Sequence, residues 1–474
     1  MNLIRRGLTA AVAALWVVFP AVAGFDGDFT GATLRVDYYH TGTATQERIA
    51  LDRARLEGAW PGSRTHLVDT TNLGKYMVEV VELATNRLIY SRGFASIYGE
   101  WETTGEARDE IWRVFPEAVR LPEPRRPFQL RLRKRQADQS FREIWSVVID
   151  PASRFVDRAP RSAGSAWAVV ENGDPAVKVD LVVLGDGYDA GQIDKFHEDA
   201  RKAAQALFEA EPFKSRKRDF NVWAVDSPAE QSGISRPRAG VFRDSPLGAR
   251  YNSLDSERYV LTLDDRAWRD QAAAAPYDFV LILVNERKYG GGGIYNLYST
   301  AAAGSAFAPY LVVHEFGHHF AGLGDEYFTS PVAYEEFSGR KIEPWEPNVT
   351  ALQDPGMLKW GNLVLKETPL PTPWNKSAYE TRSRANQAKR AELRAEGAPE
   401  ERLEELFREE RELFTEMLGQ EEHAGLVGAF EGAMYEAQGL YRPSVDCIMF
   451  TRDEVGFCEV CSHAIERVID QYAH

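Results

Sequence analysis

The first third of the chain alternates between hydrophobic and polar residues. Clear runs of this pattern occupy residues 33–39, 76–81 and 128–132, and turn residues separate them. Side chains on a strand point to opposite faces in turn, so the alternation indicates sheets with one buried face. Several short strands at this spacing predict an all-β sandwich domain over residues 25–156.

A different pattern follows, in which hydrophobic runs are continuous. Residues 177–184, 220–225 and 279–284 are apolar almost throughout, as in strands that are buried on both faces. Residues 192–210 have a helical period and lie between the first two runs. Strands that alternate with a helix predict a mixed sheet with helices packed on it, that is, an α/β domain.

Two further segments complete the predicted organisation. Residues 157–165 contain Arg, Pro, Gly and Ser and are predicted to be a linker, which assigns residues 166–474 to the second domain. Residues 375–420 are rich in Glu, Arg, Ala and Leu and contain an apolar stripe at helical spacing. We expect them to form a peripheral, amphipathic helical pair that carries no chemistry.

The strongest chemical signal is a His-Glu-x-x-His motif that follows an apolar run. His314 and His318 are four residues apart, so on a helix they lie on one face and can bind one metal ion. Glu315 is next to the first histidine and can take a proton from a zinc-activated water. The motif predicts a catalytic Zn²⁺ site with His314 and His318 as ligands and Glu315 as general base.

A third protein ligand has to come from beyond this helix. Gly322 and Gly324 follow the second histidine, where a left-handed turn would end the helix. The turn would bring Asp325 back to the metal, and we predict this residue as the third ligand, with Glu326 as the alternative. His319 points away from the pair and is expected to pack or to support the site.

Bulk properties narrow the class of protein. A chain of 474 residues is long enough for two or three domains, and its net charge of −15 argues against nucleic acid or an anionic membrane surface as a partner. Residues 1–23 resemble a signal peptide, with Arg5 and Arg6, an apolar segment and an Ala-Val-Ala cleavage site. No later stretch is predicted to span a membrane, so we expect an exported, periplasmic or extracellular protein.

The three cysteines are close together near the end of the sequence. In an oxidising compartment, Cys447 is expected to form a disulfide with Cys458 or Cys461 and to leave one free thiol. The Cys-x-x-Cys pair could also suggest a structural zinc site. Such a site needs two more ligands nearby, and His463 is the only obvious candidate.

Together these motifs resemble the bacterial IgA-cleaving metallopeptidases, a metzincin-like family of secreted zinc enzymes. The resemblance covers almost the whole chain after the signal segment. It rests on the zinc-binding stretch 314–327 and, more weakly, on the segments 90–94, 98–101, 184–188, 371–373, 430–433 and 447–449.

The family implies a metzincin-like zinc peptidase domain preceded by the β-sandwich. It also implies His314, His318 and Asp325 as metal ligands, Glu315 as general base, and Met449 in a methionine turn beneath the metal. An aspartate as third ligand departs from the wider metzincin pattern, in which that ligand is a histidine.

A second departure concerns the group that stabilises the oxyanion. Thr451 stands where some metzincins have a tyrosine, so Tyr327 and Tyr441 are the remaining candidates. The expected function is that of a secreted zinc metalloendopeptidase acting on a protein or peptide. A zinc amidase of cell-wall peptides would use the same residues, and a non-catalytic binding protein would not need Glu315. The substrate, the role of the β-sandwich and the oligomeric state stay open.

Overall fold

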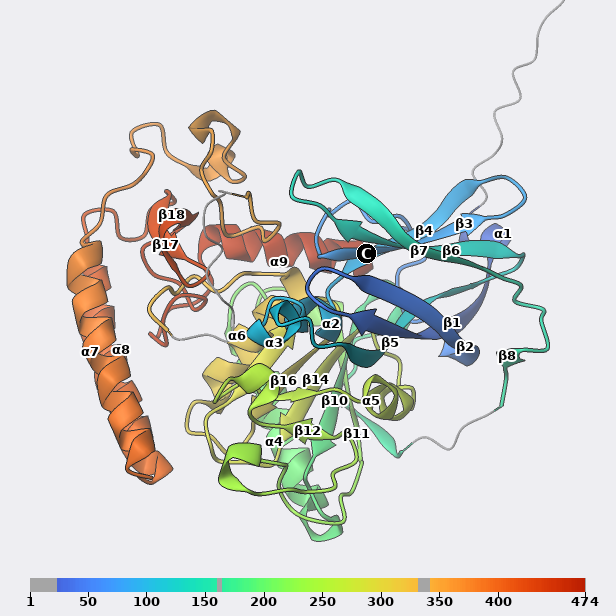
Figure 1. The fold of residues 1–474 in the computed structure, drawn as a ribbon, viewed down its shortest axis with the longest axis horizontal. Helices are drawn as coiled ribbons and strands as arrows, with labels where there is room; N and C mark the ends of the chain where they lie inside the picture. Colours follow the sequence, from blue (N-terminus) through green and yellow to red (C-terminus); the bar gives the residue numbers. More distant parts are fainter. Residues whose placement is uncertain (1–23, 160–163, 331–341, 474) are drawn as a thin grey trace, which may run out of the picture.

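Two four-stranded sheets form the N-terminal part of the chain (Figure 1). Inward-facing side chains of both sheets, among them Val36, Val80, Leu121 and Leu130, share one hydrophobic core, as the alternating pattern predicts. Helices α1 (Phe25–Asp28), α2 (Ile97–Trp101) and α3 (Gly105–Arg108) are short. The strand orders are β5-β1-β2-β8 and β4-β3-β6-β7, with β1 Phe29–Gly42, β2 Glu47–Ala59, β3 Tyr76–Glu82, β4 Arg87–Phe94, β5 Arg113–Pro124, β6 Phe128–Arg135, β7 Phe141–Ile149 and β8 Val156–Asp157.

The computed structural model describes residues 24–159, 164–330 and 342–473. The predicted signal segment, residues 1–23, lies outside the described residues, as does part of the predicted linker, residues 160–163. Within the described ranges, no helix has both the length and the apolar character needed to cross a membrane.

A six-stranded mixed sheet is the centre of the second part. Strands β11, β10, β14 and β16 are parallel, and β9 and β15 run antiparallel at the two edges. The three continuous hydrophobic runs correspond to β10, β11 and β14, which confirms the mixed α/β class. The bounds are β9 Ala166–Val170, β10 Val179–Asp186, β11 Phe220–Val225, β14 Phe279–Val284, β15 Gly291–Ile294 and β16 Tyr298–Ala302.

Helix α6 (Ala308–Ala321) carries the His-Glu-x-x-His motif. It packs on β14, β15 and β16 and against helices α4 (Ile193–Glu209) and α9 (Glu459–Tyr472). Phe316 and Phe320 face the sheet, where their rings contact Phe279. This apolar contact fixes the direction of the opposite face of α6. The smaller elements are α5 (Asp265–Ala272) and the strand pairs β12 (Ala249–Arg250) with β13 (Leu261–Thr262) and β17 (Phe430–Ala433) with β18 (Glu436–Arg442).

The glycine run before α6 allows the helix to lie directly on the edge strand β15. A Cβ atom on Gly293 would lie 2.2 Å from the carbonyl oxygen of Glu315, so no side chain fits there. The outer edge of β15 is covered at Gly291, whose carbonyl accepts from the Val260 N–H and whose N–H donates to the Arg258 carbonyl. The run of residues 290–293 is therefore packed between α6 on one side and the segment 258–260 on the other.

The charged segment 375–420 forms two helices, as predicted. They are α7 (Lys376–Ala395) and α8 (Glu400–Gly419), drawn in orange in Figure 1. They lie at the edge of the molecule in Figure 1, and α8 packs on the second part of the chain. Phe407 is buried against Tyr289 and Phe307, and Glu410 forms a 2.7 Å ion pair with Arg452. Apolar and paired residues along α8 thus anchor the helices on the second part of the chain.

The two parts of the chain share an interface. Asp270 at α5 accepts from Arg35 and Arg55 of the N-terminal part, at 2.8 and 3.0 Å. Arg120 donates to the carbonyl of Tyr277 at 2.7 Å.

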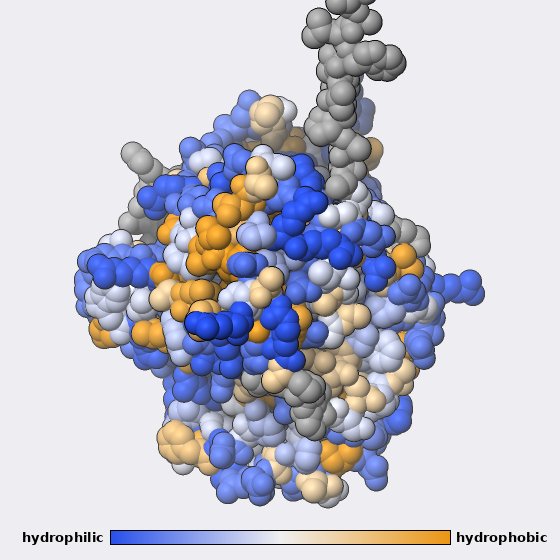
Figure 2. All heavy atoms as spheres, turned by 90° about the vertical axis from the view of Figure 1, so that its right-hand side faces the viewer, coloured by the Kyte–Doolittle hydropathy of each residue, from blue (hydrophilic) through white to orange (hydrophobic). Residues whose placement is uncertain are grey.

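On the side of the N-terminal part, the surface is mostly hydrophilic, with apolar side chains gathered in a few patches (Figure 2).

Candidate metal centre

Three side chains converge at the end of α6. The Nε2 atoms of His314 and His318 lie 3.2 Å apart. Asp325 Oδ1 lies 3.3 Å from the first of these nitrogens and 3.1 Å from the second. The helix ends at Gly322 in the left-handed conformation, with φ of +63°, which turns the following chain back toward the histidines.

The triangle of ligand atoms fits a zinc ion. Tetrahedral Zn²⁺ with bonds of about 2.0–2.1 Å places neighbouring ligand atoms about 3.3–3.4 Å apart. Asp325 Oδ1 is buried and has no hydrogen-bond partner among the described residues, although both imidazoles are close to it. A buried carboxylate oxygen that lacks a hydrogen bond is costly unless a cation is beside it. The donor set, two imidazoles and one carboxylate, is one that zinc prefers.

Hydrogen bonds set the orientation of both imidazoles. His314 Nδ1 lies 2.9 Å from the Ile448 carbonyl, and His318 Nδ1 lies 2.5 Å from the Leu323 carbonyl. A carbonyl only accepts, so each Nδ1 carries the hydrogen. In the neutral ring, each Nε2 then turns its lone pair toward the other two ligand atoms, as metal binding requires.

Charge within the triangle favours a cation. Burial would raise the pKa of Asp325, but the two histidines outweigh burial and lower this pKa well below its usual value. Burial would lower the pKa of His318, but Asp325 outweighs it and raises the pKa of His318 to about 9. Without a metal, His318 therefore holds a proton at neutral pH and is itself the cation beside Asp325 Oδ1. A bound metal ion has to displace that proton.

Glu315 lies beside the triangle, on the same helix. One of its carboxylate oxygens is within 4.8 Å of a ligand atom of each histidine. Burial raises the pKa of Glu315, while the charges of His314 and His318 act in the opposite direction. A carboxylate with a raised pKa is a stronger base than an exposed one, so the position suits proton transfer.

Two residues near the motif face elsewhere. The structure brings Asp325, and not Glu326, to the histidines. Glu326 is fully buried on the other side, where Asn348 donates to its Oε1 at 2.9 Å. His319 points away, as expected. It accepts from the Val280 N–H, and burial lowers its pKa to about 3, so it is a neutral packing residue.

A tight turn containing Met449 lies beneath α6. The carbonyl of Cys447 accepts from the N–H groups of Phe450 and Thr451 at 2.8 and 3.1 Å. Met449 is fully buried, and a Cβ atom on Gly317 would lie 3.2 Å from its sulfur. The sulfur of Met449 therefore lies against the helix that carries the two histidines.

Sequence reasoning missed Tyr435 and Arg258. Tyr435, at the tip of the β17–β18 hairpin with φ of +67°, donates from its hydroxyl to Asp325 Oδ2. Arg258 donates to the hydroxyl of Tyr327 at 2.7 Å. Tyr327 thus lies at the site. Tyr441, which belongs to β18, pairs through its backbone with Thr350 instead. A tyrosine at a hairpin tip has no local signal that would have identified it.

A pocket adjoins the centre on the side of His314. Tyr310, whose hydroxyl lies 3.2 Å from His314 Nδ1, is part of its wall, together with Tyr327. Helices α7 and α8 contribute further lining residues, so the helical pair shapes the surroundings of the site. The lining residues contributed by these two helices are Tyr379, Ser383, Gln387, Glu410, Arg411 and Phe414.

Comparison with known proteins agrees with this arrangement. Residues 168–469 match the model of the IgA peptidase M64 family, and residues 24–146 match that of the peptidase M64 N-terminus. A search among curated proteins found no match. The larger match covers more than half of the chain and includes the whole candidate centre. The chain therefore belongs to the IgA peptidase M64 family, a family of metallopeptidases, and is a peptide-bond hydrolase.

Proposed function

We propose that this protein is an exported zinc metalloendopeptidase of metzincin-like architecture. His314, His318 and Asp325 would hold the zinc ion, and Glu315 would be the general base. The observation that carries the proposal is the triangle of His314 Nε2, His318 Nε2 and Asp325 Oδ1, with edges of 3.1–3.3 Å and Glu315 beside it. Export rests on the sequence of residues 1–23.

Each residue at the site has a distinct task in peptide hydrolysis. A bound zinc ion supplies Lewis-acid polarisation of the scissile carbonyl and lowers the pKa of the attacking water. Glu315 takes a proton from that water and passes it to the leaving nitrogen. The carbonyls of Ile448 and Leu323 hold the histidines in the required tautomer, and Tyr435 orients Asp325.

Tyr327 is our candidate for stabilising the oxyanion. Its hydroxyl accepts a hydrogen bond from Arg258 and lies 3.4 Å from the hydroxyl of Tyr435. Its ring is stacked near that of His314, with 6.4 Å between the centroids. A hydroxyl that accepts from a cation is a better donor to a developing negative charge than one that does not.

The architecture has three features that support the metzincin-like assignment. The sheet ends in the antiparallel edge strand β15, which lies against α6. Helix α6 stops at a left-handed glycine, Gly322, before the aspartate. The turn at Met449 lies under the same helix.

The test is digestion of an unbiased peptide library by the purified full chain. We expect cleavage that a chelator abolishes and that added Zn²⁺ restores. Immunoglobulin A and cell-wall peptides are separate arms of the assay, because the second would reveal an amidase. Cleavage that persists both after chelation and in Glu315→Gln would overturn the proposal. A metal-loaded chain that cleaves none of these substrates would indicate a binding protein instead.

A further inference from the structure

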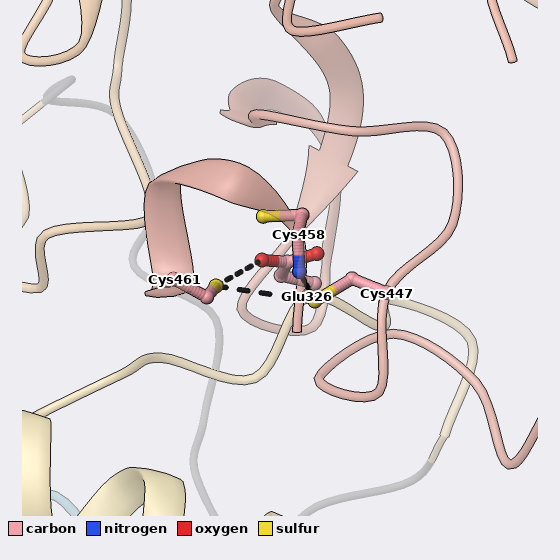
Figure 3. A group of neighbouring side chains, drawn as sticks. All are labelled: Glu326, Cys447, Cys458 and Cys461. Atoms are coloured by element: carbon pink, nitrogen blue, oxygen red, sulfur yellow. Dashed lines mark hydrogen bonds between the residues drawn. The ribbon is translucent and has the colours of Figure 1, made fainter. Parts of the chain in front are cut away.

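A second cluster of metal-ligating side chains begins at Glu326, the residue that follows Asp325, and lies on the side away from the two histidines. It consists of Glu326 and the three cysteines, and the donor atoms all lie within 4.8 Å of one another. Figure 3 shows the carboxylate of Glu326 among the three sulfur atoms. The residues come from three segments: the chain after α6, the turn beneath α6, and the start of α9.

The expected disulfide from Cys447 is absent. All three cysteines are free, and the Sγ atoms of Cys447 and Cys461 lie 3.9 Å apart, against about 2.05 Å in a disulfide. All three sulfur atoms lie within 4.8 Å of one another. Cys458 donates its backbone N–H to Cys447 Sγ at 3.3 Å.

Glu326 provides an independent indication of a cation site. Its side chain is completely buried, and its Oε2 atom has no hydrogen-bond partner among the described residues. Its other oxygen accepts from Asn348 and lies 3.4 Å from Cys461 Sγ. A buried carboxylate with one unsatisfied oxygen beside three thiols is costly unless a cation joins them.

The spacing of the donor atoms fits tetrahedral zinc. Zn–S bonds of about 2.3 Å place sulfurs about 3.8 Å apart, and a carboxylate oxygen at about 2.0 Å lies about 3.5 Å from each sulfur. Two of the six pairs agree closely, with 3.9 Å between Cys447 and Cys461 and 3.4 Å between Cys461 and Glu326, and every pair lies within 4.8 Å.

The surroundings favour a thiolate at Cys458, whose pKa is lowered by hydrogen bonds from the neighbouring cysteines, whereas burial raises the pKa of Cys447 and of Cys461. Cys458 is the N-cap of α9, a helix of 14 residues, and Cys461 lies in its first turn. The positive end of the helix dipole and the N–H donated to Cys447 both stabilise negative sulfur. The buried guanidinium of Arg442 acts electrostatically on Glu326 and offsets part of the negative charge of four anionic ligands.

We propose that Glu326, Cys447, Cys458 and Cys461 form a second, structural Zn²⁺ site. All four positions belong to the protein, so no position is left for a substrate, as is usual for structural zinc. On binding, the protons still held by the thiols and by Glu326 pass to solvent, and zinc takes their place. The site would link the backbone at Asp325 and Glu326 to the start of α9. It would also link it to the turn containing Met449, in which the Ile448 carbonyl contacts His314.

Metal counting on matched isosteric variants tests the proposal. We expect two zinc ions per purified full-length chain. Glu326→Gln and Cys458→Ser should each lower the count at the cysteine cluster, and Asp325→Asn should lower it at the histidines. A wild-type chain that binds one metal, lost in Asp325→Asn and kept in Cys458→Ser, would overturn the second site and leave the proposed function standing. The opposite pattern would overturn the catalytic zinc alone.

Cobalt substitution of the wild-type chain gives a readout that needs no variant to fold. Thiolate-to-cobalt charge-transfer absorption is expected in the wild type and in Asp325→Asn, and its absence from the wild type would contradict the proposal.

Alkylation followed by intact mass measurement counts the thiols. We expect three alkylated cysteines after chelation and unfolding, with protection before it. A single alkylated cysteine, with the other two in a disulfide, would also overturn the site.

Discussion

Asp325 and Glu326 are consecutive in the chain, yet their carboxylates belong to two different clusters. Asp325 Oδ1 lies 3.1 Å from His318 Nε2, whereas Glu326 Oε1 lies 3.4 Å from Cys461 Sγ. The N–H of Glu326 also donates to the Met449 carbonyl, which fixes the backbone between the two carboxylates. A single peptide unit therefore joins the two clusters.

Removal of the general base should abolish hydrolysis without loss of metal. Glu315→Gln keeps the size of the side chain but cannot accept the proton, so we expect kcat to fall by a factor of about 10² to 10⁴. Metal analysis of the same preparation should show the wild-type zinc content, because His314, His318 and Asp325 are unchanged. Turnover at the wild-type rate would assign the base to another residue.

Tyr435 is expected to act on the metal through Asp325. Tyr435→Phe removes the hydroxyl that donates to Asp325 Oδ2 and should weaken zinc binding about 10- to 100-fold. Tyr441→Phe is the matched control, because Tyr441 lies on the same hairpin and its backbone pairs with Thr350. Competition with a chromogenic chelator measures both affinities. Equal affinities in the two variants would contradict a positioning role for Tyr435.

The helical pair should contribute to stability through the buried face of α8. Phe407→Ala removes a buried ring that contacts Tyr289 and Phe307 and should cost about 3–5 kcal/mol of unfolding free energy. Glu412→Ala, at an exposed position of the same helix, should leave stability within about 0.5 kcal/mol of wild type. Denaturant unfolding of both variants decides this. A short linker in place of residues 375–420 should likewise lower Tm.

A buried histidine should make stability depend on pH. His40 lies between Glu117 and Glu47, at 2.9 and 2.8 Å. Burial would lower the pKa of His40, but the two carboxylates outweigh burial and raise this pKa to about 9. Since the folded pKa exceeds the unfolded value of 6.5, the contribution is complete below pH 6.5. It is lost as the pH rises through about 9 and amounts to at most about 3 kcal/mol.

The measurement is the free energy of unfolding between pH 6 and pH 10 for wild type and His40→Gln. The wild-type slope over this range should be absent from His40→Gln, whatever the absolute stability of the variant. His463→Gln changes an exposed histidine and should keep the wild-type slope. An unchanged slope in His40→Gln would assign the pH dependence to other groups.

Much of the secondary structure could be predicted from the sequence because its signals are local. Alternating residues place one face of β1, β3 and β6 in a core, and continuous apolar runs mark β10, β11 and β14. The two histidines and Glu315 could be identified because their spacing matches one turn of helix. From the glycine turn, Asp325 was the predicted third ligand and Glu326 the alternative. Which of the two carboxylates lies next to the histidines depends on the direction in which the chain leaves α6, and packing decides that direction.

Only the tertiary structure decided which contacts form between segments that are distant in the chain. Tyr435 meets Asp325 across 110 residues, and Cys461 meets Glu326 across 135. Sequence alone identified the Cys-x-x-Cys pair but left it short of a fourth ligand, and so favoured a disulfide. No local pattern indicates which buried carboxylate will reach a distant cysteine, because that depends on how α6, the turn beneath it and α9 pack together. The sequence by itself therefore determined the elements and the chemistry of the histidine motif, and packing determined which side chains meet.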